Sequence, residues 1–403
     1  MRKKVSLTGQ IGIALVLGVV AGLLLGEAAV PFVQPVGQIY LNLIKTVVIP
    51  VVTLSIIAGV VSLEDVKKVG RLGLRTVLFF LCTTAIAVTI GLVVANLLRV
   101  GAGFTTNTQT SPVTQPTAVD FSETLVNIFP ANIIAPFAEG NMLPVIVIAI
   151  FVGFGILLAG EQGRKVSAMV ASLNAVFLKI MDLIIRISPI GVFALILPVV
   201  AQQGIGVLLP LLGLVAVCYL AYGIHVLLVY GASVTWLGKV SLKRFFREMG
   251  KPMLFGFSSA SSVGVLPFNL EATKRLGVSE EVSGFVLPLG TTINMDGTAI
   301  YQGVCAVFIA RAFGMELTLS QQLSVVLTSV LASIGTAGAP GSGMIMLAMV
   351  LQSAGLPVEG IALVAGIDRV LDMGRTVVNI TGDAACSIVV QASLRRKNKN
   401  LNP

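Results

Sequence analysis

The residues best suited to chemistry lie near the C-terminal end of the chain, where a strongly apolar stretch is interrupted by charged and polar side chains. They are Asp368, Arg369, Asp372, Arg375, Asn379 and Asp383. A charged side chain at bilayer depth costs on the order of 3 kcal/mol, so residues of this kind are expected to serve a function. At about 100° per residue, all of them except Arg369 fall within roughly 80° of one another around a helix. The spacing predicts a membrane helix that carries part of a binding site.

Two segments upstream are predicted to be helical hairpins that enter the membrane and return. The first, 241–276, has apolar arms of about a dozen residues on either side of the sequence FSSASS at 257–262. Each arm is shorter than the ~20 residues that a spanning helix needs, and basic residues flank both ends. The second, 320–355, contains SIGTAGAPGSG at 333–343, whose four glycines and one proline forbid a continuous helix. The charge pattern indicates that the two hairpins enter from opposite sides.

Between the hairpins, residues 280–311 are predicted to form a broken helix, because a proline and glycines flank Asn294 and Asp296. Broken helices that meet from opposite sides are typical of inverted-repeat membrane proteins. Carbonyl oxygens freed by the breaks, with Asp296 and Asp383, would suit a hard monovalent cation, and helix N-termini at the hairpin tips would attract a carboxylate. Each motif alone also fits close helix packing or a buried polar pair, so only their combination predicts a transport site.

Composition places the chain among polytopic membrane proteins, because its 403 residues are 56% hydrophobic and 11% charged, with a mean hydropathy of +0.97. Lys and Arg gather at 2–4, 67–75, 164–165, 239–251, 274–275 and 395–399. The predicted outward loops at 101–124, 201–207 and 312–322 contain neither residue. The positive-inside rule therefore predicts a multi-pass protein of the cell (inner) membrane with both termini in the cytoplasm. Because the positive charges follow the membrane topology, the net charge of +9 does not indicate nucleic-acid binding. The same pattern favours a retained helix at 9–27 over a cleaved signal peptide.

Other residues of potential reactivity are expected to be structural. The cysteines lie in apolar segments without CxxC spacing, so buried thiols are expected at Cys82, Cys218, Cys305 and Cys386. The single histidine, His225, is expected to be packed or hydrogen-bonded within a helix, and a proton relay is the alternative interpretation. Trp236 is expected at a membrane interface. The sequence contains no nucleophile–base constellation, so an enzyme is not predicted.

These motifs resemble those of the glutamate-transporter family, the dicarboxylate/amino acid:cation symporters, and in particular its prokaryotic branch for acidic amino acids. The resemblance rests on NMDGT at 294–298, SIGTAGAPG at 333–341 and the pattern D-x3-D-x2-R-T-x2-N-x2-G-D at 368–383. It implies an all-α integral membrane fold with eight transmembrane helices, two re-entrant helical hairpins, inverted repeats and several broken helices.

The resemblance also implies a homotrimer in which a scaffold holds a moving transport domain. The scaffold would comprise helices 1 and 2 at 1–75 and the trimerisation helices at 125–200. The transport domain would comprise 76–100 and 208–394, with its last helix at 359–394, followed by a cytoplasmic tail at 395–403. The second hairpin would act as the gate.

Roles for single residues follow from the same resemblance. Arg375 matches the position that binds the side-chain carboxylate of an acidic substrate, which suits a bidentate guanidinium. Asp372 matches the position that receives the substrate ammonium. Further substrate contacts are implied for Ser261, Ser262, Thr298, Thr376 and Asn379, and for the backbone at Ala339 and Gly341.

Three sites for co-transported sodium ions are implied as well. The first is matched by Gly290, Asn294, Asn379 and Asp383. The second is matched by Thr292, Met295, Ser333, Ile334 and Thr336. The third is matched by Thr83, Thr84, Asn294 and Asp296. The chain departs from the family at Phe80, where relatives often have a tyrosine near the third site. Neither Ala260 nor Met373 supplies the extra arginine of other members, and Arg369 either replaces it or pairs with Asp368.

Charge complementarity narrows the expected substrate and coupling ion. Asp372 favours an amino acid, because succinate has no ammonium and its carboxylates would be repelled. Arg375 favours an acidic side chain, because an unpaired buried guanidinium is costly. We therefore expect uptake of aspartate or glutamate, with the choice between them open. Sodium is favoured because Asp296 and Asp383 lie among freed carbonyls. A proton-coupled glutamate or C4-dicarboxylate symporter and, in another class, an ion channel are the alternatives.

Overall fold

The computed structural model describes residues 7–69, 71–104, 126, 129–139, 141–333 and 342–401, and within these ranges the chain is helical without any β-strand. Four helical stretches are long and apolar enough to cross a membrane, namely Gly9–Val61, Leu72–Leu97, Leu208–Leu237 and Asp368–Arg395. Shorter apolar helices accompany them at Pro144–Leu158, Ser188–Gln202, Leu319–Ser333 and Gly343–Ser353. The predicted all-α class is confirmed, while the number of membrane crossings stays a prediction.

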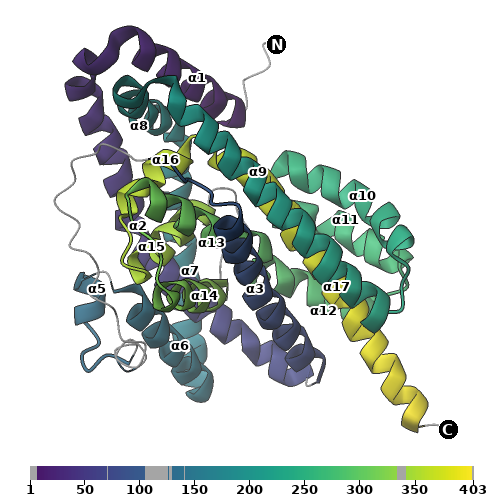
Figure 1. Ribbon diagram of the computed structural model, residues 1–403. Coiled ribbons are helices and arrows are strands. Elements are labelled where there is room, and N and C mark those ends of the chain that lie inside the picture. The colour runs from purple at the N-terminus through teal and green to yellow at the C-terminus, as the bar shows by residue number, and fades with distance from the viewer. Residues whose placement is uncertain are drawn as a thin grey trace, which may run out of the picture.

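The first group of helices comes mainly from the N-terminal half. It contains α1 (Leu7–Leu25), η1 (Gly26–Ala29), α2 (Val30–Val69), α5 (Ala135–Glu139), α6 (Met142–Leu158), α7 (Gly160–Arg186), α8 (Ser188–Gln203) and η2 (Gly204–Val207). The long α2 packs against α6, α7 and α8, and α1 packs against α8 (Figure 1). A Cβ atom on Gly37 of α2 would lie 3.0 Å from the carbonyl oxygen of Ala194 in α8, so glycine favours this close approach. The predicted scaffold corresponds to this group, and its role stays a prediction.

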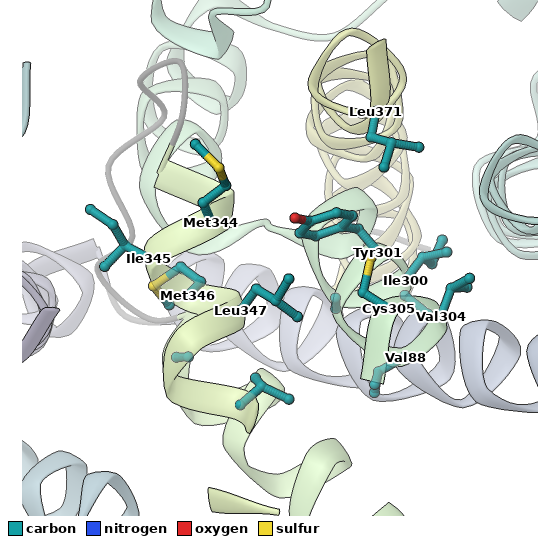
Figure 2. Packing of buried hydrophobic residues seen from close by; sticks show 14 of the residues in the cluster. Val88, Ile300, Tyr301, Val304, Cys305, Met344, Ile345, Met346, Leu347 and Leu371 are labelled. Carbon is teal, nitrogen blue, oxygen red and sulfur yellow. The ribbon is translucent and has the colours of Figure 1, made fainter. Parts of the chain in front are cut away.

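The second group contains the candidate site residues that the structure describes. It contains α3 (Arg71–Leu97), α9 (Leu208–Ile224), η3 (His225–Tyr230), η4 (Ser233–Leu237), α10 (Leu242–Ser259), α11 (Ser262–Arg275), α12 (Glu280–Ile293), α13 (Asp296–Ala312), α14 (Leu319–Ser333), α15 (Ser342–Ser353), η5 (Val358–Gly360), α16 (Ile361–Ala365) and α17 (Asp368–Leu401). The central helix is α13, which packs against α3, α9, α14, α15 and α17 and is buried at every position except Arg311. Figure 2 shows this core, with Tyr301 and Cys305 of α13 near Leu347 of α15 and Val88 of α3.

The predicted interruptions of helix are observed in the first hairpin and in the segment between the hairpins, whereas the one predicted for the second hairpin falls outside the described residues. The first hairpin breaks at Ala260, whose φ of 50° and ψ of 43° are left-handed, so α10 ends and α11 begins on either side of it. The predicted broken helix is interrupted at Asn294 and Met295, which separate α12 from α13. Pro288 and Gly290 were expected to flank the break, but they lie within α12 and do not end it. In the second hairpin, α14 and α15 pack against each other on either side of residues 334–341, which lie outside the described residues.

The cysteines follow the prediction with one exception. Cys218, Cys305 and Cys386 are buried, as expected, but the expectation of burial is wrong for Cys82, which is exposed. The physical reason is helix periodicity: α3 turns the next two residues, Thr83 and Thr84, inward, which directs the preceding position outward.

The contact between α13 and α17 should depend on the absence of a side chain at Gly297. A Cβ atom there would clash with the backbone of Arg375, and overpacking of this kind costs roughly 1–3 kcal/mol. We expect Gly297→Ala to lower the melting temperature of the purified protein. The matched control is Gly284→Ala on α12, where a Cβ atom would meet nothing within 4 Å. Equal melting temperatures for the two variants would contradict the close approach of α13 and α17.

Candidate functional site

The centre of the candidate site is Arg375 on α17, whose side chain is only 2% exposed. Its Nη1 donates to Asp368 Oδ1 at 2.9 Å and its Nη2 donates to Asp368 Oδ2 at 3.3 Å, a bidentate pairing of guanidinium and carboxylate. Nη2 also lies 2.9 Å from Asp372 Oδ1. The predicted charged face is therefore confirmed as a buried face of α17. On this face, Asp368 and Asp372 form ion pairs with Arg375.

Two neighbouring helices enclose the guanidinium. The Arg375 Cζ atom lies 4.2 Å from the ring centroid of Tyr301 on α13, within the range of a cation–π interaction. On another side, a Cβ atom on Gly343 would clash with the guanidinium, so the first turn of α15 is in direct contact with it. The positive end of α15 thus lies beside a positive side chain, which is a favourable place for an anion.

Arg369 connects this cluster to the first hairpin. Its Nη1 lies 3.2 Å from Asp372 Oδ2, and its Nη2 donates to the carbonyl oxygen of Ser259, the last residue of α10, at 3.3 Å. Pairing of Arg369 with Asp368 was one of the two sequence-based alternatives, and the structure pairs Arg369 with Asp372 instead. Residues three apart on a helix lie on the same face, whereas adjacent residues do not.

Most of the other residues predicted to contact substrate lie on α17 or at the starts of α11 and α13, which pack against α17. Ser261 caps α11 by accepting a hydrogen bond from the Gly264 N–H at 3.2 Å, and Ser262 beside it is buried. Thr376 donates to the Asp372 carbonyl oxygen at 2.9 Å, and Thr298 lies at the start of α13. Ala339 and Gly341 lie outside the described residues.

The four residues matched to the first sodium site are brought together. Asn294 Nδ2 donates to Asp383 Oδ1 and to the carbonyl oxygen of Asn379, both at 2.8 Å. A Cβ atom on Gly290 would clash with the Asp383 carboxylate, so glycine is required there. The Asn294 Oδ1 atom is buried without a hydrogen-bond donor. An acceptor in this state fits an oxygen ligand of a hard cation.

The residues matched to the second sodium site are described only in part. Thr292 donates to the carbonyl oxygen of Leu289 at 2.9 Å, and buried Ser333 donates to that of Val330 at 2.7 Å. Met295 Sδ accepts a hydrogen bond from Asn379 Nδ2 at 3.4 Å, which ties the break before α13 to α17. Ile334 and Thr336 lie outside the described residues.

The third set surrounds Asp296, which is fully buried at the start of α13. Thr84 donates to Asp296 Oδ1 at 2.6 Å, Tyr230 donates to Asp296 Oδ2 at 2.6 Å, and His225 Nε2 lies 3.1 Å from the same Oδ2. Asn294 and Thr83, the other two residues of this set, are also buried. The Thr83 hydroxyl, however, donates to the Phe80 carbonyl oxygen and not to Asp296. Both carboxylate oxygens of Asp296 are therefore already hydrogen-bonded.

Two of these partners, His225 and Tyr230, were absent from the sequence-based list of site residues. The interpretation of His225 as a hydrogen-bonded helix residue is confirmed, and its ring meets that of Tyr230 edge-on at 4.6 Å. Both lie in η3, a π-helical segment, and such segments occur frequently at functional sites. A lone histidine in a membrane helix was the available sign in the sequence.

The charges of the site do not balance. Among the described residues, the buried acids are Asp296, Asp368, Asp372 and Asp383, and they are accompanied by the guanidinium groups of Arg369 and Arg375. If all four acids are ionised, two negative charges remain, which require cations or protons. No three His, Cys, Asp or Glu side chains in the described part of the chain are placed to share a metal ion. The oxygen atoms of Asn294 and Asp383 suit a hard cation.

A double-mutant cycle should detect an interaction free energy between Arg375 and Asp368, because the two side chains form a buried ion pair. Arg375→Met would leave the buried Asp368 carboxylate without its guanidinium partner and should lower the free energy of unfolding by about 3–5 kcal/mol. Adding Asp368→Asn should recover part of this loss, as in a double-mutant cycle. Unfolding of the purified protein, followed with increasing denaturant, measures both effects. Arg369→Met is the control, because the Arg369 side chain is 20% exposed and should cost less. Additive effects of the first two substitutions would contradict the pairing.

Comparison with known proteins supports the sequence-based resemblance. Residues 7–393 match the model of the sodium:dicarboxylate symporter family. The proton/sodium-glutamate symport protein of Bacillus subtilis (strain 168) is 36% identical over 399 residues, covering 96% of this chain and 93% of the relative. The proton/glutamate-aspartate symporter of Escherichia coli (strain K12) is 33% identical, with 96% and 92% covered.

A third relative differs in the substrate that its name states. The C4-dicarboxylate transport protein of Bacillus subtilis (strain 168) is 33% identical over 395 residues, covering 96% of this chain and 93% of the relative. The relatives are transporters, and the apolar helices of this chain agree with a multi-pass membrane protein. The chain therefore belongs to the sodium:dicarboxylate symporter family and is a membrane symporter, not an enzyme.

Proposed function

We propose that the protein takes up aspartate or glutamate together with sodium ions by alternating access. The observation that carries this proposal is the buried guanidinium of Arg375 beside the carboxylate of Asp372, 2.9 Å apart on one helix face. An acidic amino acid offers a carboxylate to the first group and an ammonium to the second, so one ligand complements both. A C4-dicarboxylate lacks the ammonium, which argues against it even though one relative bears that name.

Sodium is the proposed coupling ion. Two negative charges of the site lack a guanidinium partner, and the unpaired Asn294 Oδ1 supplies a neutral oxygen near Asp383. Carboxylate and carbonyl oxygens suit hard cations. We propose Gly290, Asn294, Asn379 and Asp383 as the best supported of the three sites, because described contacts join all four.

Proton coupling is the second candidate, and one observation favours it locally. The chain's own O–H and N–H groups already occupy both oxygens of Asp296, which a sodium ion in the third site would need. The Escherichia coli relative is named for protons and the Bacillus subtilis relative for protons and sodium. Both ions therefore need to be tested side by side.

The proposal extends to assembly and movement. The first helix group would form the scaffold of a homotrimer in the cell (inner) membrane, with both termini in the cytoplasm. The second group would move across it as the transport domain, because α3, α9 and α14–α17 pack against α13, and α10–α12 pack against α17. The second hairpin would serve as the gate, since α15 contacts Arg375 through Gly343.

Uptake into liposomes tests the proposed function. Purified protein should accumulate radiolabelled aspartate against its gradient when sodium is high outside, and less when only a proton gradient is imposed. Uptake should saturate with aspartate and stop when an ionophore collapses the sodium gradient. Accumulation driven equally well by protons alone would support the second candidate, and flux that neither gradient drives would indicate a channel.

Arg375→Cys should abolish aspartate accumulation in the same assay, because the cysteine cannot bind a carboxylate bidentately. Arg164→Cys on the exposed start of α7 is the control for insertion and folding. Unchanged aspartate affinity in Arg375→Cys would refute the role of the guanidinium.

Substitution of Asp383 should change the sodium dependence of uptake, whereas substitution of Asp368 should change the affinity for the amino acid. Asp383→Asn keeps an acceptor for Asn294 but removes a charge, so the sodium concentration for half-maximal uptake should rise roughly tenfold or more. The preference for aspartate over succinate should not change. Asp368→Asn is the matched control and should alter substrate affinity more than sodium dependence, because Asp368 contacts Arg375. The reverse pattern would exclude the cation role of Asp383.

A further inference from the structure

A cavity outside the candidate site lies at one end of the second helix group. Its volume is about 420 Å³, and it is enclosed by the chain after η4, the start of α10, the turn between α11 and α12 and the last turns of α17. These segments lie side by side in Figure 1. Three basic side chains line the cavity, those of Lys239, Arg244 and Arg395, and no acidic residue does.

The basic residues of the cavity differ from their neighbours in their partners. Nearby Lys274 lies 2.6 Å from Glu280, which raises the pKa of Lys274 through a hydrogen bond and charge attraction. Arg275 likewise lies 2.9 Å from Glu271. In the described part of the chain, no carboxylate pairs with any of the three cavity residues. The cavity therefore concentrates positive charge that the protein leaves uncompensated.

Backbone contacts hold the two arginines in place. Arg244 Nη2 donates to the Arg275 carbonyl oxygen at 2.7 Å, and Arg395 Nη2 donates to the Gly277 carbonyl oxygen at 2.8 Å. A guanidinium has five N–H donors, so each arginine keeps others for a ligand. Lys239 has a left-handed φ of 59°, a conformation that is unfavourable for residues other than glycine. Such strain at a lysine is compatible with a functional position.

The depth of the cavity indicates where its ligand comes from. Two candidate membrane spans end at its wall, Leu208–Leu237 and Asp368–Arg395. Trp236, one turn from Lys239, is 73% exposed, and tryptophan is enriched at the level of lipid headgroups. The cavity thus opens where the apolar parts of both helices give way to water, which is the level of a headgroup phosphate.

We propose that this cavity binds the phosphate of an acidic phospholipid headgroup, held by Arg244 and Arg395 with Lys239 at the rim. Arginine forks complement phosphate oxygens, and basic pockets between membrane helices bind anionic headgroups. All of the lining belongs to the second helix group, so the lipid would contact the part of the protein that carries the candidate site. The inference goes beyond the proposed function, because it requires neither aspartate nor sodium.

Native mass spectrometry of the intact purified protein tests this. Titration with phosphatidylglycerol should give tighter binding than titration with phosphatidylcholine. Arg244→Gln/Arg395→Gln should weaken phosphatidylglycerol binding roughly tenfold to thirtyfold. The matched control is Arg247→Gln/Arg275→Gln, which removes two nearby arginines that pair with carboxylates and should change binding less than twofold. Lys239→Gln breaks no described hydrogen bond and should also weaken binding. This variant tests the cavity independently in case the double variant fails to fold.

Three results would overturn the proposal. Equal loss of binding in the control variant would reduce the effect to general surface charge. Equal affinity for the two lipids would remove the preference for an acidic headgroup. Competition by glycerol phosphate or inorganic phosphate at concentrations similar to those of the lipid would make the ligand a soluble anion.

Discussion

A carboxylate or guanidinium is tolerated in an apolar interior only when its charge and its hydrogen bonds are matched, and this requirement governs the second helix group. Arg375 contacts Asp368, Asp372 and the ring of Tyr301, and it is almost completely buried. Asp296 is hydrogen-bonded to three side chains, from the two helical segments α3 and η3. The packing of α13 between α3 and α17 follows from these requirements, since the polar partners come from different helices.

The breaks in the helices also supply hydrogen-bond partners for buried polar groups. At the break between α12 and α13, Asn294 Nδ2 reaches both Asp383 Oδ1 and the carbonyl oxygen of Asn379. The break also lets the Gly297 N–H donate to Asn379 Oδ1 at 2.8 Å. Non-helical backbone at this depth is stable only because such partners satisfy it. The polar site and the irregular backbone therefore depend on each other.

The sequence predicted the features that depend on local spacing. The buried face of α17 follows from helix periodicity, and the breaks at Ala260 and Asn294 follow from polar and glycine-rich sequence within apolar segments. Choices among partners could not be predicted in this way. Arg369 pairs with Asp372, and His225 reaches Asp296 across 71 positions, because tertiary packing determines which side chains meet. The exposure of Cys82 was missed for a related reason: an apolar sequence does not reveal which face of a helix meets the core.

The pairing of Arg375 bears directly on how the proposed substrate and cations would be coupled. In this structure Asp368 occupies both Nη atoms of the guanidinium, so a substrate carboxylate must share or replace that contact. Replacement leaves Asp368 buried with a weaker partner, and the arriving substrate carries a net charge of its own. The first effect leaves an existing negative charge less compensated and the second adds one, so binding of the proposed substrate would raise the demand for cations. One charge moved through 100 mV corresponds to about 2.3 kcal/mol, or roughly a fiftyfold gradient. Under the proposed function, a site of this charge would therefore favour the entry of more than one cation with each acidic amino acid.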